Sequence, residues 1–147
     1  MRVIEIVALA LFLAAMVPPS AAPLSRQYFC FFDSASAELS PRCQLIAHEF
    51  AAWWRRARRG EDYRWPEGTL LPATAMQVEV IGHADAAEAA AGKASVSDAR
   101  AEAAAAFLRL NGVPAEAIKV TAFDSGRPLV PANGAEPQNR RVELYAR

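Results

Sequence analysis

The sequence predicts an α/β fold of the α+β kind, in which helices pack on a mixed sheet. Along the chain, short runs that are aromatic-rich or alternate apolar and polar residues are followed by longer runs with helical periodicity. The 147 residues are long enough for a single domain with a real hydrophobic core, and they contain no internal repeat. The order of the predicted elements is β-α-β-α-β-β, which favours a sheet covered by helices.

Four segments have the patterns of strands. The first is aromatic-rich (QYFCFF), and the second, MQVEVI, alternates apolar and polar residues. A connection rich in proline and glycine separates the last two. The expected strands cover residues 27–32, 76–81, 119–123 and 141–145.

Two segments are predicted helices. Ser40 caps the first, with Pro41 at its first position, and this helix ends before the loop of residues 60–75. Ser95 or Ser97 caps the second, which runs over 98–110. The apolar stripe expected on the second helix consists of Ala103, Ala106, Phe107 and Leu110.

The alanine-rich stretch before this second helix stays open between helix and loop. Alanine favours a helix, but Gly92 interrupts the run. Helix and loop therefore both remain as alternatives for the secondary structure of this stretch.

Residues 1–22 have the pattern of a secretory signal peptide, which leaves residues 23–147 as the domain. A positive start precedes an uncharged apolar run of 12 residues, Ile6 to Val17, and small residues follow. That run is shorter than the roughly 20 residues of a membrane-spanning helix. An uncleaved anchor is the alternative, and no cysteine near the cleavage region signals lipid attachment.

Export permits a disulfide, and the chain has only two cysteines, Cys30 and Cys43. A bond across this short loop would stabilise the fold by about 3 kcal/mol. Two buried free thiols are the alternative.

Several function classes are disfavoured. The 16 basic and 16 acidic residues give no net charge, which argues against nucleic acid as a partner. The pattern HE-x-x-H fails because Ala52 stands where the second histidine would be, so we expect no metal site and no cofactor. No nucleophile has an evident base, so we expect no catalytic residues and no enzyme. The basic stretch WWRRARR predicts the end of a core helix, with binding of anionic lipid or glycan as the alternative.

Four segments occur together in a recognisable order. Asp85 is followed after ten residues by Val96-Ser97 and, two residues later, by Arg100-Ala101. The other three segments are FFDSASAELSP, AFDSGRPLV and PQNRRVE. Together they resemble the family of OmpA-like C-terminal, peptidoglycan-binding domains of Gram-negative envelope proteins, as in OmpA, Pal and MotB. The resemblance covers residues from about 27 to 147.

This resemblance implies a periplasmic, non-catalytic domain that binds the diaminopimelate of peptidoglycan stem peptides. By position, Asp85 would take the ammonium group and Arg100 the carboxylate, since a planar guanidinium matches a carboxylate well. Arg140 would assist, and the backbone of Ser34 and Ala35 would line the pocket. The alternative is a plain internal salt bridge between Asp85 and Arg100.

The chain departs from the family pattern around this site. Ala84 replaces the family's threonine, Lys93 its usual asparagine, and Glu88 stands where relatives often have glycine. Lys93 would either add a contact to the ligand carboxylate or fill the site by pairing with Asp85. The second case describes the rival function, an envelope interaction scaffold with weakened or lost peptidoglycan binding. Its partner would be another envelope protein, bound through the loop 60–75, and neither function involves a transmembrane barrel in this chain.

Overall fold

The computed structural model describes residues 26–59 and 77–146, and their elements follow the predicted order with one added short helix. The strands are β1 (Arg26–Phe31), β2 (Val78–Gly82), β3 (Ile118–Ala122) and β4 (Arg141–Ala146). The α-helices are α1 (Pro41–Arg58), α2 (Ala86–Ala90) and α3 (Val96–Leu110). Short 3-10 turns cover Ala115–Ala117 and Pro137–Asn139.

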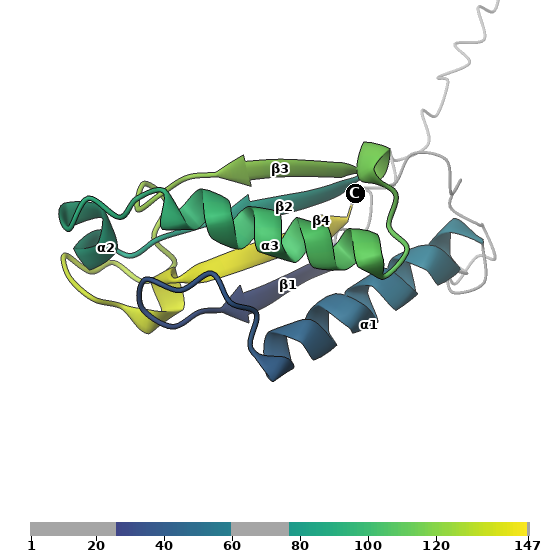
Figure 1. Cartoon of the computed structure of the whole chain (residues 1–147), viewed down its shortest axis with the longest axis horizontal. Coiled ribbons are helices and arrows are strands. Elements are labelled where there is room, and N and C mark those ends of the chain that lie inside the picture. The colour runs from purple at the N-terminus through teal and green to yellow at the C-terminus, as the bar shows by residue number, and fades with distance from the viewer. Residues whose placement is uncertain (1–25, 60–76, 147) are drawn as a thin grey trace, which may run out of the picture.

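The strands form one mixed sheet, as the sequence predicts, and their order in it is β1-β4-β2-β3. β4 runs antiparallel to β1 and β2, whereas β2 and β3 are parallel. α1 and α3 lie on the same face of the sheet (Figure 1). The carboxyl ends of β1, β2 and β3 meet at one end, beside α2, while Arg26 pairs with Ala146 at the other end (Figure 1).

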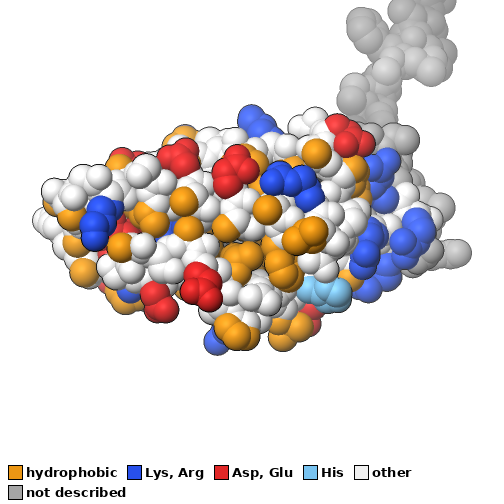
Figure 2. Space-filling view, in the orientation of Figure 1, with side chains coloured by type: hydrophobic (Ala, Val, Ile, Leu, Met, Phe, Trp, Pro, Cys, Tyr) orange, Lys and Arg blue, Asp and Glu red, His pale blue; other side chains and the backbone are white. Residues whose placement is uncertain are grey.

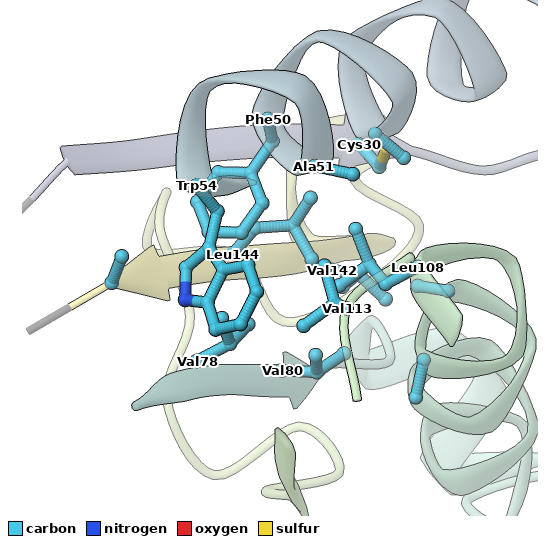
Figure 3. Packing of buried hydrophobic residues seen from close by; sticks show 14 of the residues in the cluster. Cys30, Phe50, Ala51, Trp54, Val78, Val80, Leu108, Val113, Val142 and Leu144 are labelled. Atoms are coloured by element: carbon cyan, nitrogen blue, oxygen red, sulfur yellow. The ribbon is translucent and has the colours of Figure 1, made fainter. Parts of the chain in front are cut away.

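The hydrophobic core lies between the sheet and these two helices (Figure 3). In β2 every second residue is buried, because the alternating side chains of a strand face opposite sides of the sheet. Trp53 and Trp54 are buried in α1, which confirms that WWRRARR continues a core helix. Cys30 and Cys43 form the predicted disulfide, which joins β1 to α1.

Both ends of α1 follow the sequence signals. The Ser40 hydroxyl accepts a hydrogen bond from the Cys43 N–H, and Pro41 occupies the first turn. The last turn carries Arg55, Arg56 and Arg58, which complement the partial negative charge of a helix C-terminus. Basic side chains gather over this end of the molecule (Figure 2).

Two predictions for α3 were wrong. Ser95 precedes the helix but makes no capping hydrogen bond with its side chain. The stripe is also rotated, because Leu110 is 86% exposed and the buried face instead consists of Ser97, Arg100, Ala101, Ala104, Ala105 and Leu108. Alanines on every side of this helix hide its period, so the sequence pattern gave no clear inward face.

The open question about the alanine-rich stretch is resolved as a one-turn helix, α2. Asp85 and Glu88 form its capping box, in which each side chain accepts a hydrogen bond from the other's backbone N–H. Gly92, just beyond, has a φ of 71°, which suits glycine and ends the helical run.

The predicted signal peptide (1–22) and the loop 60–75 lie outside the described residues. Within residues 26–59 and 77–146, no helix is both long and apolar enough to span a membrane.

Candidate functional site

Close packing of β2 against α3 places the candidate site at the end of the sheet. A Cβ atom on Gly82 would lie 2.0 Å from the backbone oxygen of Ser97, so only glycine fits between the strand and the start of α3. This contact brings Arg100, one turn further along α3, over the residues that follow β2.

Arg100 is fully buried and all five of its N–H donors have partners. Nε donates to the Ser36 carbonyl at 2.8 Å. Nη1 donates to the His83 carbonyl at 3.0 Å, and Nη2 to the Asp33 carbonyl at 3.0 Å. The other two donors bind the two carboxylate oxygens of Glu88, at 2.8 and 2.7 Å. The anion beside Arg100 is therefore Glu88.

The Glu88 carboxylate is held by two backbone groups in addition to Arg100. Oε1 accepts from Ala35 N at 2.7 Å and Oε2 from Asp85 N at 3.1 Å. Burial would raise the pKa of Glu88, but the hydrogen bonds from Arg100 and these two N–H groups outweigh it and lower the pKa. Glu88 is thus a buried, ionised side chain.

Asp85 pairs with a different arginine. Its Oδ1 accepts from Glu88 N at 2.8 Å, while Oδ2 accepts from Arg140 Nη1 at 2.9 Å and from Glu136 N at 3.2 Å. Burial opposes ionisation of Asp85, yet these hydrogen bonds lower its pKa below the ordinary value. Asp85 is 1% exposed.

The site therefore contains two crossed ion pairs, Glu88–Arg100 and Asp85–Arg140. The simple Asp85–Arg100 salt bridge, which was the alternative from the sequence, does not form. Glu88 connects the two residues instead, because its Oε2 accepts from both the Asp85 backbone and the Arg100 side chain. Two acids and two bases balance each other, as buried charges require.

Arg140 is the arginine of this cluster that faces open space. Its Nε donates to the Phe32 carbonyl at 3.1 Å and its Nη1 to Asp85, while its Nη2 has no partner among the described residues. The side chain is 12% exposed. It borders a pocket of about 680 Å³, whose lining also includes Phe31, Phe32, Asp33, Ser36, Glu38, Ser40, Pro41, Pro137 and Gln138.

The other predicted site residues are placed in different ways. Ala35 contributes its N–H to Glu88, whereas its neighbour Ser34 is exposed. Ala84 is buried and donates its N–H to the Asp124 carbonyl. Lys93 is exposed, and in residues 26–59 and 77–146 its ammonium has no ion pair, so Lys93 does not fill the site. Glu88 takes that place.

Glu88 and Asn139 organise the site, although neither was predicted to do so from the sequence. The signal for Glu88 was present, since Asp85-x-x-Glu88 is a capping box, but the helix cap was predicted at Ser95 or Ser97 instead. Asn139 is buried and clamps Leu129 and Val130 through their backbone groups. This clamp fixes the connection that leads into Arg140.

His83 lies next to the site in sequence but turns its ring toward Glu143 and Phe123. Burial and the nearby Arg141 lower the pKa of His83 to about 4, against the opposing effect of Glu143. The ring is therefore neutral at pH 7. Across the part of the chain that the structure describes, no group of three or more His, Cys, Asp or Glu side chains is arranged to hold a metal ion.

Comparisons with known proteins identify the family of this arrangement. The sequence model of the OmpA family matches residues 69–141. The chain carries a domain of the OmpA family. A curated relative, an outer membrane protein of Gluconacetobacter diazotrophicus, is 33% identical over 128 residues, which are 82% of this chain and 30% of the relative. The chain thus spans less than a third of that protein's length.

Solved structures of OmpA-like domains share the fold. The OmpA-like domain of FopA1 from Francisella tularensis superposes with a TM-score of 0.65 at 19% identity, covering 82% of this chain and 71% of that one. The peptidoglycan-associated lipoprotein of Burkholderia pseudomallei gives 0.62 at 19% identity, covering 81% and 89%. At these identities the likeness concerns the fold, which agrees with the mixed sheet and its two packed helices.

Proposed function

We propose that this domain is a non-catalytic, periplasmic component of the cell envelope that associates with peptidoglycan by binding the diaminopimelate of its stem peptide. The observation that carries the proposal is the Asp85–Arg140 pair at the edge of an open pocket, in a domain of the OmpA family. One structural relative is a peptidoglycan-associated lipoprotein, which supports the same ligand.

The charges at this pocket suit a zwitterionic ligand. The free end of diaminopimelate presents an ammonium group beside a carboxylate. The unpartnered Nη2 group of Arg140 offers the carboxylate a charge-assisted hydrogen bond. Asp85 lies directly behind Arg140, and Asp33 lines the same pocket, so negative charge for the ammonium is close by. Arg100 and Ala35 stand behind this outer contact and are held by Glu88.

A second function is favoured by one specific observation. Every donor of Arg100 is satisfied inside the protein, so the residue that should take the ligand carboxylate has no free N–H. Under this alternative the domain is an interaction scaffold with weakened or lost peptidoglycan binding. Its pocket, with Phe31 47% exposed on the wall, would then receive another envelope protein.

Sedimentation with purified sacculi of the diaminopimelate type separates the two functions. We expect the wild-type protein to co-sediment, and Asp85→Asn and Arg140→Gln to remain in the supernatant. Lys93→Ala is the matched control, because it removes an exposed charge that has no ion pair among the described residues. Wild-type protein that stays in the supernatant would support the scaffold instead. Release of soluble wall fragments would contradict a non-catalytic role.

A further inference from the structure

The Glu88 carboxylate is bound in the way that a free ligand carboxylate would be. The guanidinium of Arg100 contacts both oxygens, and each oxygen accepts one more hydrogen bond from a backbone N–H, Ala35 for Oε1 and Asp85 for Oε2. Arg100 Nη2 lies 2.7 Å from Oε1 and Nη1 lies 2.8 Å from Oε2, while Ala35 N is 2.7 Å from Oε1 and Asp85 N is 3.1 Å from Oε2. Two-point binding by arginine with added N–H donors is the strong form of carboxylate recognition.

The groups that bind Glu88 are held in place by other contacts. Three backbone carbonyls fix the guanidinium of Arg100 whether or not Glu88 is present. Ala35 has a φ of 54°, a left-handed conformation that costs a residue with a side chain about 1 kcal/mol. The strained turn aims the Ala35 N–H at the carboxylate. A carboxylate receptor is therefore already formed by three separate segments of the chain.

By contrast, the helix that carries Glu88 is weakly anchored. α2 has only five residues, and its other members are alanines that bury little surface. Glu88 is the one buried residue of this short helix. Exposed residues 91–93 follow, including Gly92, which has no atom near its Cβ position. Moving Glu88 out of the receptor together with α2 would disturb little packing, and besides the contacts of its own carboxylate it would break the backbone hydrogen bonds of Glu88 to Asp85 Oδ1 and from Lys93 N.

The receptor and the open pocket share a wall. Asp33 and Ser36 give their carbonyls to Arg100 and also line the pocket, and Arg140 lines the pocket while it binds Asp85. A ligand in the pocket is thus separated from the receptor by the turn of residues 33–36.

We propose that Glu88 is an internal competitor that determines affinity at this site. The chain's own side chain occupies the carboxylate receptor, and the carboxylate of an amino-acid end binds Arg100 only by displacing Glu88 together with α2. This inference rests on the proposed function for the natural source of that carboxylate. The apparent affinity for such a ligand is then lowered by the small fraction of molecules in which Glu88 has left.

Glu88→Ala tests the competition, with acetate and diaminopimelate as probes. We expect this variant to melt below the wild type and to regain melting temperature in acetate, relative to chloride at equal ionic strength. The wild type should show no such difference. Titration calorimetry should give diaminopimelate binding at least about tenfold tighter in the variant. Glu88→Gln, which keeps the shape but loses the charge, should show a smaller gain, and it provides the test if Glu88→Ala does not fold.

The outcomes separate this inference from the proposed function. Folded Glu88 variants that gain neither acetate stabilisation nor affinity would overturn the competition, even if the wild type binds sacculi. If the wild type fails to bind sacculi but Glu88→Ala gains acetate stabilisation, the competition stands and the proposed function of the natural chain fails.

Discussion

The two ion pairs at the end of β2 differ in what surrounds them. In the inner pair, Arg100 is fully buried, and every donor is used inside the protein. In the outer pair, Arg140 keeps the Nη2 donors open beside a pocket of about 680 Å³. The role of an arginine at a predicted binding position is therefore decided by its neighbours. The inner pair organises three segments of the fold, and the outer pair is the one open to a ligand while Glu88 occupies Arg100.

The largest expected effect comes from breaking the inner pair. Arg100→Met would leave the Glu88 carboxylate buried without a cation, so we expect a loss of about 3–5 kcal/mol in the free energy of unfolding. Urea denaturation at pH 7, followed by tryptophan fluorescence, measures it. The double variant Arg100→Met/Glu88→Met should recover part of the loss, because the uncompensated charge is gone. A loss below about 1 kcal/mol in the single variant would mean that the pair is not buried as described.

The pH dependence of the free energy of unfolding distinguishes the contribution of His83, on the other side of the sheet, from the contributions of the two ion pairs. The unfolded chain takes up a proton on His83 near pH 6.5, whereas burial and Arg141 lower its folded pKa to about 4. Stability should therefore fall as the pH drops from about 6.5 to 4, by about 3 kcal/mol in all. Arg127, which also lowers this pKa, and Glu143, which raises it, are the other charges that act on the ring.

His83→Gln should flatten this part of the stability curve, measured by urea denaturation at each pH. Asp85 and Glu88 have lowered pKa values, so they stay ionised through the same window. Their stabilisation is present above their unfolded pKa values of about 4 and is lost only as the pH falls further, through their folded values. An unchanged slope between pH 6.5 and 4 in His83→Gln would contradict the assignment.

Gly82→Ala tests the packing that places the inner pair. The added Cβ would lie 2.0 Å from the Ser97 oxygen, so the start of α3 must shift and carry Arg100 with it. We expect a loss of about 2–3 kcal/mol in the free energy of unfolding. Gly134→Ala is the matched control, since its Cβ would meet no atom within 4 Å. Equal denaturation midpoints for the two variants would show that the close approach does not matter.

The outer pair should contribute least to stability. In Arg140→Gln, water from the pocket reaches the place of the lost guanidinium, and Asp85 keeps its hydrogen bonds from Glu88 N and Glu136 N. We expect a cost of about 1.5 kcal/mol. Thermal unfolding of Arg140→Gln beside Arg100→Met measures the contrast, and an equal loss in both variants would remove the distinction between an inner and an outer pair.

The fold could be predicted from the sequence because each strand and α1 has a local signal of its own. Alternation marks Val78–Gly82, and Ser40 with Pro41 marks the start of α1. α3 shows the limit of this approach, since a helix made largely of alanine has no apolar contrast from which to identify the buried face. The placement of Leu110 failed for that reason.

For the site, the sequence could identify the positions but not the pairing. Asp85, Arg100 and Arg140 lie together at one end of the sheet, and their role in binding a ligand stays a prediction. Which acid meets which base depends on the turn around Ala35 and on the one-turn helix that carries Glu88. Neither segment has a periodic sequence pattern, so the sequence does not indicate that Glu88, and not Asp85, pairs with Arg100.

The register of β1 on β4 also decides in which direction the site faces. Arg26 and Ala146 lie opposite each other at one end of the sheet (Figure 1), whereas Asp85 and Arg140 lie beyond the strand ends at the other. Both described termini therefore lie at the end of the domain opposite the pocket. Because neither Arg26 nor Ala146 borders the pocket, the pocket can face an extended surface without either of these residues lying between.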